Sequence, residues 1–89
     1  MENNKWQAYG NNIEVLPVSK EKVIGNTQKY YLLGTVVSKG VQVNPAIEIG
    51  DMLGYTLWGV NKIEDANGQE HFYIQDNSDF ILAIIKNEA

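Results

Sequence analysis

One histidine and three serines are the residues of this chain best suited to acid–base or nucleophilic chemistry. His71 lies in a segment that alternates as a strand does, with Phe72 and Ile74 on one face and His71 on the other. We therefore expect His71 to face solvent rather than to act as a catalytic base. A serine nucleophile needs a base within hydrogen-bond reach, and no nucleophile-elbow motif surrounds Ser19, Ser38 or Ser78. The sequence predicts that the protein is not an enzyme.

The acidic residues around Asn67-Gly68 could bind a hard cation through their carboxylate oxygens. Their spacing matches no calcium-loop pattern, so we interpret Glu64, Asp65 and Glu70 as solvated charges at a hairpin tip. The lack of cysteine excludes thiolate nucleophiles, cysteine zinc sites and iron–sulfur clusters. The glycines do not follow the order of a phosphate-binding loop. The sequence therefore predicts no metal site and no cofactor.

The composition is that of one small, acidic globular domain. Its 89 residues are enough for one domain, and a hydrophobic content of 44% predicts a folded chain. The net charge of -4 disfavours nucleic acid and anionic membranes as partners, because both are bound chiefly through Lys and Arg. No signal peptide or membrane-spanning run is recognisable, so we expect a cytoplasmic protein. A core this small, without disulfides, favours stabilisation by oligomerisation.

Short strands separated by glycine-containing turns predict an all-β barrel or sandwich. Asn67-Gly68 tolerates the positive φ angles of a hairpin turn and gives the clearest local prediction. Pro17 has no N–H group for a central ladder, so we expect its strand to lie at a sheet edge or a bulge. The predicted strands cover residues 13–18, 30–38, 51–58, 60–64, 69–75 and 80–85. The predicted segments are a tail or lead-in strand (1–12), the domain (10–86) and a frayed end (87–89).

Several short motifs, each containing a glycine or an acidic residue beside a strand, follow one another in a distinctive order. They are Gly34-Thr35-Val36-Val37, Gly40, Gly50-Asp51 and Ser78-Asp79-Phe80-Ile81-Leu82-Ala83-Ile84. In this order the chain resembles the small co-chaperonins of the GroES-like, or chaperonin-10, family, and the resemblance covers nearly all of residues 10–86. It implies an all-β fold, a small GroES-like β-barrel.

The resemblance also implies a homo-oligomer, a heptameric ring in which strand 13–18 of one subunit pairs with strand 80–85 of the next. Such pairing would cover exposed strand edges and enlarge an undersized core. Phe80 departs from the family pattern, because it separates Asp79 from Ile81 where the family has Asp and Ile adjacent. The implied interface residues are Ile13, Val15, Leu16, Val18, Phe80, Ile81, Leu82 and Ile84.

Family members carry a mobile loop after the first strand, with three consecutive apolar residues that dock on a large chaperonin ring. The corresponding segment here, residues 19–29, is short, and its apolar residues are Val23 and Ile24, beside Gly25. The resemblance implies that these three form a chaperonin-docking loop that folds on binding; a loop packed on its own barrel is the alternative. The family's roof hairpin falls in residues 38–48, which are also short. Such trimming is typical of a divergent, phage-encoded relative.

Two functions follow from the resemblance. The first is a co-chaperonin that caps an ATP-driven chaperonin ring and assists protein folding. The second is a structural or assembly protein, such as a ring or decoration subunit of a phage particle, that keeps the barrel without binding a chaperonin. The shortened loop and roof favour the second function.

Overall fold

The computed structural model describes residues 5–18, 22–24 and 29–87, and the side chains of residues 5–18 and 32–87. These residues form strands and turns with one single-turn 3-10 helix, so the protein is all-β, as predicted. Each of the six predicted strands is found within two residues of its expected bounds, and a short strand lies between the first two. The elements are β1 (Asn12–Pro17), β2 (Lys22–Ile24), β3 (Lys29–Lys39), β4 (Met52–Thr56), η1 (Leu57–Gly59), β5 (Val60–Glu64), β6 (Glu70–Gln75) and β7 (Ile81–Ile85).

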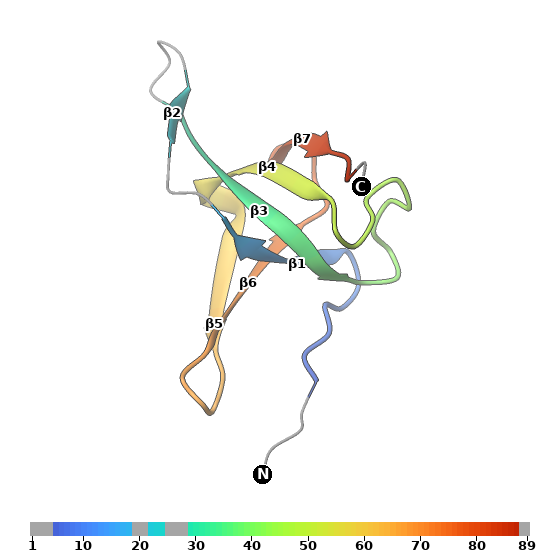
Figure 1. The fold of residues 1–89 in the computed structure, drawn as a ribbon, viewed down its shortest axis with the longest axis vertical. Coiled ribbons are helices and arrows are strands. Elements are labelled where there is room, and N and C mark those ends of the chain that lie inside the picture. The colour runs from blue at the N-terminus through green and yellow to red at the C-terminus, as the bar shows by residue number, and fades with distance from the viewer. Residues whose placement is uncertain (1–4, 19–21, 25–28, 88–89) are drawn as a thin grey trace.

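The described strands form one antiparallel sheet in the order β5-β6-β1-β3-β4-β7, and β2 pairs with β3 outside this order (Figure 1). β1 lies inside the sheet, because Ile13 is opposite Lys39 of β3 on one side and Ile74 of β6 on the other. Of the two predicted positions for this strand, the sheet edge is therefore wrong at residues 12–15, where β6 covers it, whereas the bulge is present as a register shift in the β1–β3 pairing between Glu14 and Val15.

Pro17 is accommodated in β1 because only the first part of this strand has neighbours on both sides. Pairing with β6 ends at Val15, whereas pairing with β3 continues to Pro17. Val18 donates its backbone N–H to the carbonyl of Leu33 at 2.9 Å. Successive residues of a strand direct their backbone groups to opposite sides, so the nitrogen of Pro17 faces away from β3. The missing N–H falls beyond the end of the β6 ladder and costs no hydrogen bond in the sheet.

The core combines alternate residues of the central strands with two residues of the long turn region between β3 and β4. Val43 and Ile47, from this turn region, are 5% and 2% exposed, so it closes over the sheet. Tyr55 of β4 is fully buried, and burial raises the pKa of its phenol to about 12. The buried cluster consists of Ile13, Val15, Val36, Val43, Ile47, Leu53, Tyr55 and Ile74.

Two glycines of the sequence motifs are required by close packing. A Cβ atom at Gly34 would lie 2.9 Å from the Tyr55 hydroxyl and 3.1 Å from the Cβ of Val15. A Cβ atom at Gly40 would lie 2.1 Å from the carbonyl oxygen of Gly10. The chain just before β1 therefore crosses in direct backbone contact with the end of β3, which fixes where Gly10 lies on the sheet.

Candidate assembly and docking site

β7 is an outer strand whose apolar side chains face solvent. Within the described ranges it pairs with β4 alone. Leu82 is 52% exposed, Ile84 38% and Ile85 47%, and both faces of the strand are represented among them. An apolar run of strand length is typical of a strand buried on both faces, yet both faces of β7 are exposed in this chain. An exposed apolar outer strand offers both backbone hydrogen bonds and side-chain area to another strand.

The predicted interface residues fall into an inward and an outward group. Ile13 and Val15 are 0% and 2% exposed and belong to the core, so they do not reach a neighbouring subunit. Leu16 and Val18 are 59% and 51% exposed, at the end of β1 that β6 leaves open. The remaining residues belong to the β7 region: Phe80 and Ile81 are half-buried against the core, whereas Leu82 and Ile84 are exposed.

The β4–β7 pairing has a local irregularity close to Phe80. Gly54 is opposite Ala83 and Tyr55 is opposite Ile81, so Leu82 has no direct partner across the ladder. The Phe80 ring lies against Gly59, where a Cβ would come within 2.6 Å of it. The β4–β7 pairing therefore shifts register and leaves Leu82 in a bulge on the outer strand.

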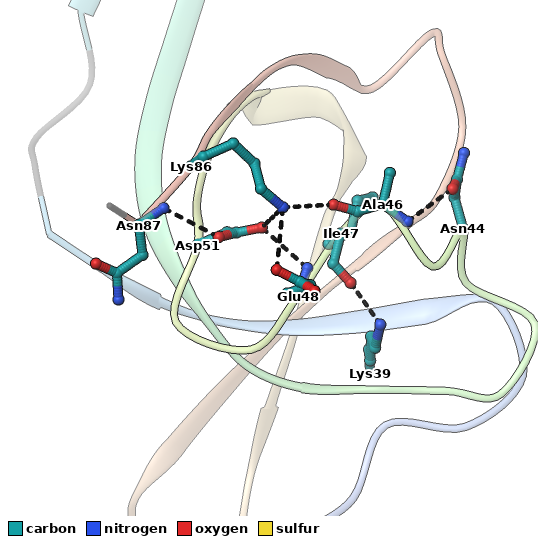
Figure 2. A network of polar contacts seen from close by, with 8 residues as sticks. All are labelled: Lys39, Asn44, Ala46, Ile47, Glu48, Asp51, Lys86 and Asn87. Atoms are coloured by element: carbon teal, nitrogen blue, oxygen red, sulfur yellow. Dashed lines mark hydrogen bonds and ion pairs between the residues drawn. The ribbon is translucent and has the colours of Figure 1, made fainter. Parts of the chain in front are cut away.

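The carboxyl end of β7 is fixed by a buried carboxylate, that of Asp51 (Figure 2). Lys86 Nζ lies 2.6 Å from Asp51 Oδ2, and the backbone N–H of Asn87 donates to Oδ1 at 3.1 Å. Hydrogen bonds from Lys86 and from the backbone of Glu48 lower the pKa of Asp51 to about 2, and the Asp51 carboxylate raises the pKa of Lys86. Asp51 thus joins the end of β7 to the turn before β4, although residue 87 was expected to fray.

Two lysines donate hydrogen bonds to the turn region between β3 and β4. Lys86 Nζ also donates to the carbonyl of Ala46 at 2.7 Å, and Lys39 Nζ donates to the carbonyl of Ile47 at 2.5 Å. The Asn44 side chain accepts the N–H of Ala46 at 2.9 Å. Residues 40–51 consequently form a set of anchored turns, with no strand assigned within that range.

Two members of the predicted docking loop lie in β2. Val23 is opposite Tyr30 of β3, and Ile24 is opposite Lys29, so the segment predicted as a loop contains a short hairpin strand. Gly25 lies outside the described residues. Figure 1 places β2 beside the amino-terminal end of β3, apart from the strands that surround the core. The hairpin thus carries this apolar pair away from the body of the sheet.

His71 is buried, with 8% of its surface exposed, and the prediction of a solvent-facing His71 is wrong. Its Nδ1 lies 2.9 Å from Glu14 Oε2 and its Nε2 lies 2.9 Å from Asp65 Oδ2. The rings of Trp6 and His71 stack with centroids 4.1 Å apart. His71 lies on the face of β6 that the alternation predicts, but Trp6, from the chain before β1, covers that face. Both ring nitrogens are engaged, so neither is free to take a proton from a substrate.

The three acidic residues at the tip of the β5–β6 hairpin differ in exposure. Glu64 and Glu70 are exposed, as expected, and Glu70 forms an ion pair with Lys62 at 3.1 Å. Asp65 instead turns inward to His71. Sequence reasoning missed this cluster because Glu14 and His71 are 57 residues apart, and only the β1–β6 pairing brings them together.

No family model matches the chain, and no curated protein matches it significantly. Within the part of the chain that the structure describes, no group of His, Asp and Glu side chains is arranged to hold a metal ion. No helix formed by those residues is long and apolar enough to cross a membrane.

Proposed function

We propose that the protein is a non-enzymatic, cytoplasmic, GroES-like co-chaperonin: a subunit that forms a homo-oligomeric ring, caps an ATP-driven chaperonin and assists protein folding. The observation that carries the proposal is the pair of features at opposite ends of the chain, the exposed apolar outer strand β7 and the projecting β2–β3 hairpin. The order of sequence motifs from Gly34 to Ile84 supports the same family.

Self-assembly through β7 is supported by its exposed apolar side chains and by a complementary segment elsewhere in the chain. Leu16 and Val18 are exposed at the end of β1, where β6 has stopped pairing. Contact between β7 of one subunit and this segment of the next is heterologous, and heterologous contacts that close make rings. The Asp51–Lys86 contact supports this role, since it holds the end of β7 in place before any partner arrives.

Oligomeric state tests the assembly. We expect native mass spectrometry at micromolar concentration to show a ring for the parent protein and monomers for Leu82→Lys, because a lysine on an outer strand opposes strand pairing. Leu82 is 52% exposed, so the variant monomer should stay folded by circular dichroism. Ile63→Lys is the matched control, because Ile63 is 47% exposed on β5, the other outer strand. A monomeric parent, or a ring that survives Leu82→Lys, contradicts the proposal.

Chaperonin capping depends on the β2–β3 hairpin. Seven weak hairpins acting together in a ring bind far more tightly than one, which compensates for a short apolar anchor. We expect the parent to co-elute with a chaperonin ring and nucleotide in size exclusion, and Ile24→Asp to lose that co-elution while keeping its own ring. Val41→Asp is the control, because Val41 is 97% exposed in a turn far from β2 in the sequence. If Ile24→Asp binds the chaperonin ring as well as the parent does, the hairpin is not the docking element.

The second candidate function is a ring or decoration subunit of a phage particle that binds no chaperonin. The anchored turns at residues 40–51 favour it, because they occupy the place of the family's roof hairpin. A parent protein that forms a ring yet never co-elutes with a chaperonin would support this function over the first.

A further inference from the structure

A continuous chain of hydrogen bonds connects the segment before β1 to the turn between β5 and β6. It begins where the backbone N–H of Ala8 donates to Ser38 Oγ at 3.0 Å, and Ser38 Oγ donates to Glu14 Oε1 at 3.0 Å. The other oxygen of Glu14 contacts His71 Nδ1 at 2.9 Å, and His71 Nε2 contacts Asp65 Oδ2 at 2.9 Å. One titratable ring, that of His71, therefore lies in the middle of the chain.

The Asp65 end of this chain shapes the turn. Asp65 Oδ1 accepts the backbone N–H groups of Asn67 at 2.9 Å and Gln69 at 3.0 Å. The carboxylate thus binds the turn with one oxygen and His71 with the other. Any movement of Asp65 away from His71 changes the support of the whole turn.

The geometry requires a protonated ring. A neutral imidazole has one N–H donor and one acceptor nitrogen, so it can satisfy only one of two carboxylates. The second carboxylate would then face a lone pair at 2.9 Å, which is repulsive. An imidazolium donates to both Glu14 and Asp65, and its charge favours the flat stacking of Trp6 at 4.1 Å and 9° between the ring planes.

We propose that His71 is a pH-sensitive switch that holds the amino-terminal segment, residues 5–8, and the β5–β6 turn on the sheet together while it is protonated, and releases both when it loses its proton. This inference goes beyond the proposed function and does not depend on it. It rests on the clustering of groups from three separate segments, Trp6, Glu14 and Asp65, around one buried ring of β6.

The charged groups that face the ring determine where the switch operates. Glu14 comes from β1, Asp65 from the turn after β5, and Lys5 lines the hollow of about 600 Å³ beside them. Hydrogen bonds to Glu14 and then Asp65 raise the pKa of His71 above its usual 6.5, against the opposing effect of burial. The same contact lowers the pKa of Asp65, and burial together with Glu14 raises the pKa of Tyr73.

The direction of the pH effect follows from this shift. Since the folded-state pKa of His71 lies above the unfolded one, the stabilisation is complete below 6.5 and disappears as pH rises through the folded value. The segment 5–8 should therefore be bound below pH 6.5 and released as pH rises through the folded-state pKa of His71.

Proton NMR of the single histidine and fluorescence of Trp6 test the switch on the intact chain. In a Trp58→Phe background, which leaves Trp6 as the only tryptophan, we expect the His71 midpoint above 6.5 and a Trp6 emission change with the same midpoint. Asp65→Asn should lower that midpoint by about one pH unit, since it removes one of two neighbouring anions. Asp79→Asn is the control, because it makes the same charge change at an exposed site.

Three results would overturn the proposal. The first is a His71 midpoint at or below 6.5, and the second is an equal effect of Asp65→Asn and Asp79→Asn. The third is Trp6 emission that does not change across the His71 transition. In that case His71 would lose its proton while residues 5–8 stay bound to the sheet. His71→Gln should remove the Trp6 transition altogether; if it fails to fold, the Asp65→Asn titration still decides the matter.

Discussion

The contact between Gly40 and Gly10 allows a direct test of how the chain before β1 is held on the sheet. A Cβ atom at residue 40 would lie 2.1 Å from the Gly10 carbonyl oxygen and 2.6 Å from its nitrogen, whereas ordinary contact begins at 3.4 Å. Both atoms belong to the backbone, so no side-chain rotation relieves the overlap. Gly40→Ala must therefore separate the two segments by the difference, about 1.3 Å.

The cost of this separation follows from the hydrogen bonds that cross the contact. Gly40 donates its N–H to the carbonyl of Asn12 at 2.9 Å, and Gln42 donates to the carbonyl of Gly10 at 2.9 Å. Each bond contributes about 0.5–1.5 kcal/mol net, so losing both costs about 1–3 kcal/mol. Alanine restricts the unfolded chain, which offsets about 0.4–1 kcal/mol. Taking the middle of each range, we expect Gly40→Ala to lower the free energy of unfolding by about 1.3 kcal/mol.

Urea unfolding followed by circular dichroism measures this loss, and Gly54→Ala is the matched control. The nearest atoms to a Cβ at Gly54 are side-chain carbons of Leu33 and Ala83, at 3.7 and 3.9 Å, which is ordinary contact. Gly54→Ala should leave stability unchanged or raise it by up to about 1 kcal/mol. If Gly40→Ala is as stable as the parent, or if both variants lose the same free energy, the close backbone contact does not govern stability as argued.

Two further predictions concern the core and the Asp51 contact. Leu53→Ala, at a residue with no exposed surface, should lower the free energy of unfolding by about 2–5 kcal/mol, whereas Leu82→Ala on exposed β7 should change the monomer by about 0.5 kcal/mol or less, measured by urea unfolding. The pKa of Asp51 is lowered from 3.8 to about 2 in the folded protein, so its stabilisation is complete above 3.8 and is lost as pH falls toward 2. Lys86→Met should weaken this acid dependence in urea melts at a series of pH values; unchanged acid dependence would contradict the role of Lys86.

The sequence by itself determined which segments become strands and where the clearest turn lies. Strand composition and turn residues act over a few neighbours, so local reading placed six strands within two residues of their bounds. Gly68 has a φ of +83°, as a hairpin turn at Asn67-Gly68 requires. Gly54 lies at a register shift in the β4–β7 pairing, and a glycine inside a strand often marks such an irregularity.

In the turn region between β3 and β4, apolar residues alternate with polar residues or glycine, and this pattern does not reveal which of them reach the core. Val43 and Ile47 are buried, whereas Val41 and Ile49, from the same run, are exposed. Pro45 interrupts the strand pattern, so the direction of each side chain depends on the turns that follow it. Those turns are set by contacts with Lys39 and Lys86, residues outside the region.

Only the tertiary structure decided the position of β1, the exposure of β7 and the burial of His71. Pro17 favoured an edge for β1, but the order of strands depends on pairing between distant segments, and β6 stops just before the proline. β7 has the composition of a buried strand, yet it pairs with β4 alone in the part of the chain that is described. His71 sits on the face that alternation assigns to solvent, and becomes buried because Trp6 covers it and Glu14 and Asp65 approach it. Local patterns specify strands and faces; which face is covered depends on long-range contacts that no local pattern contains.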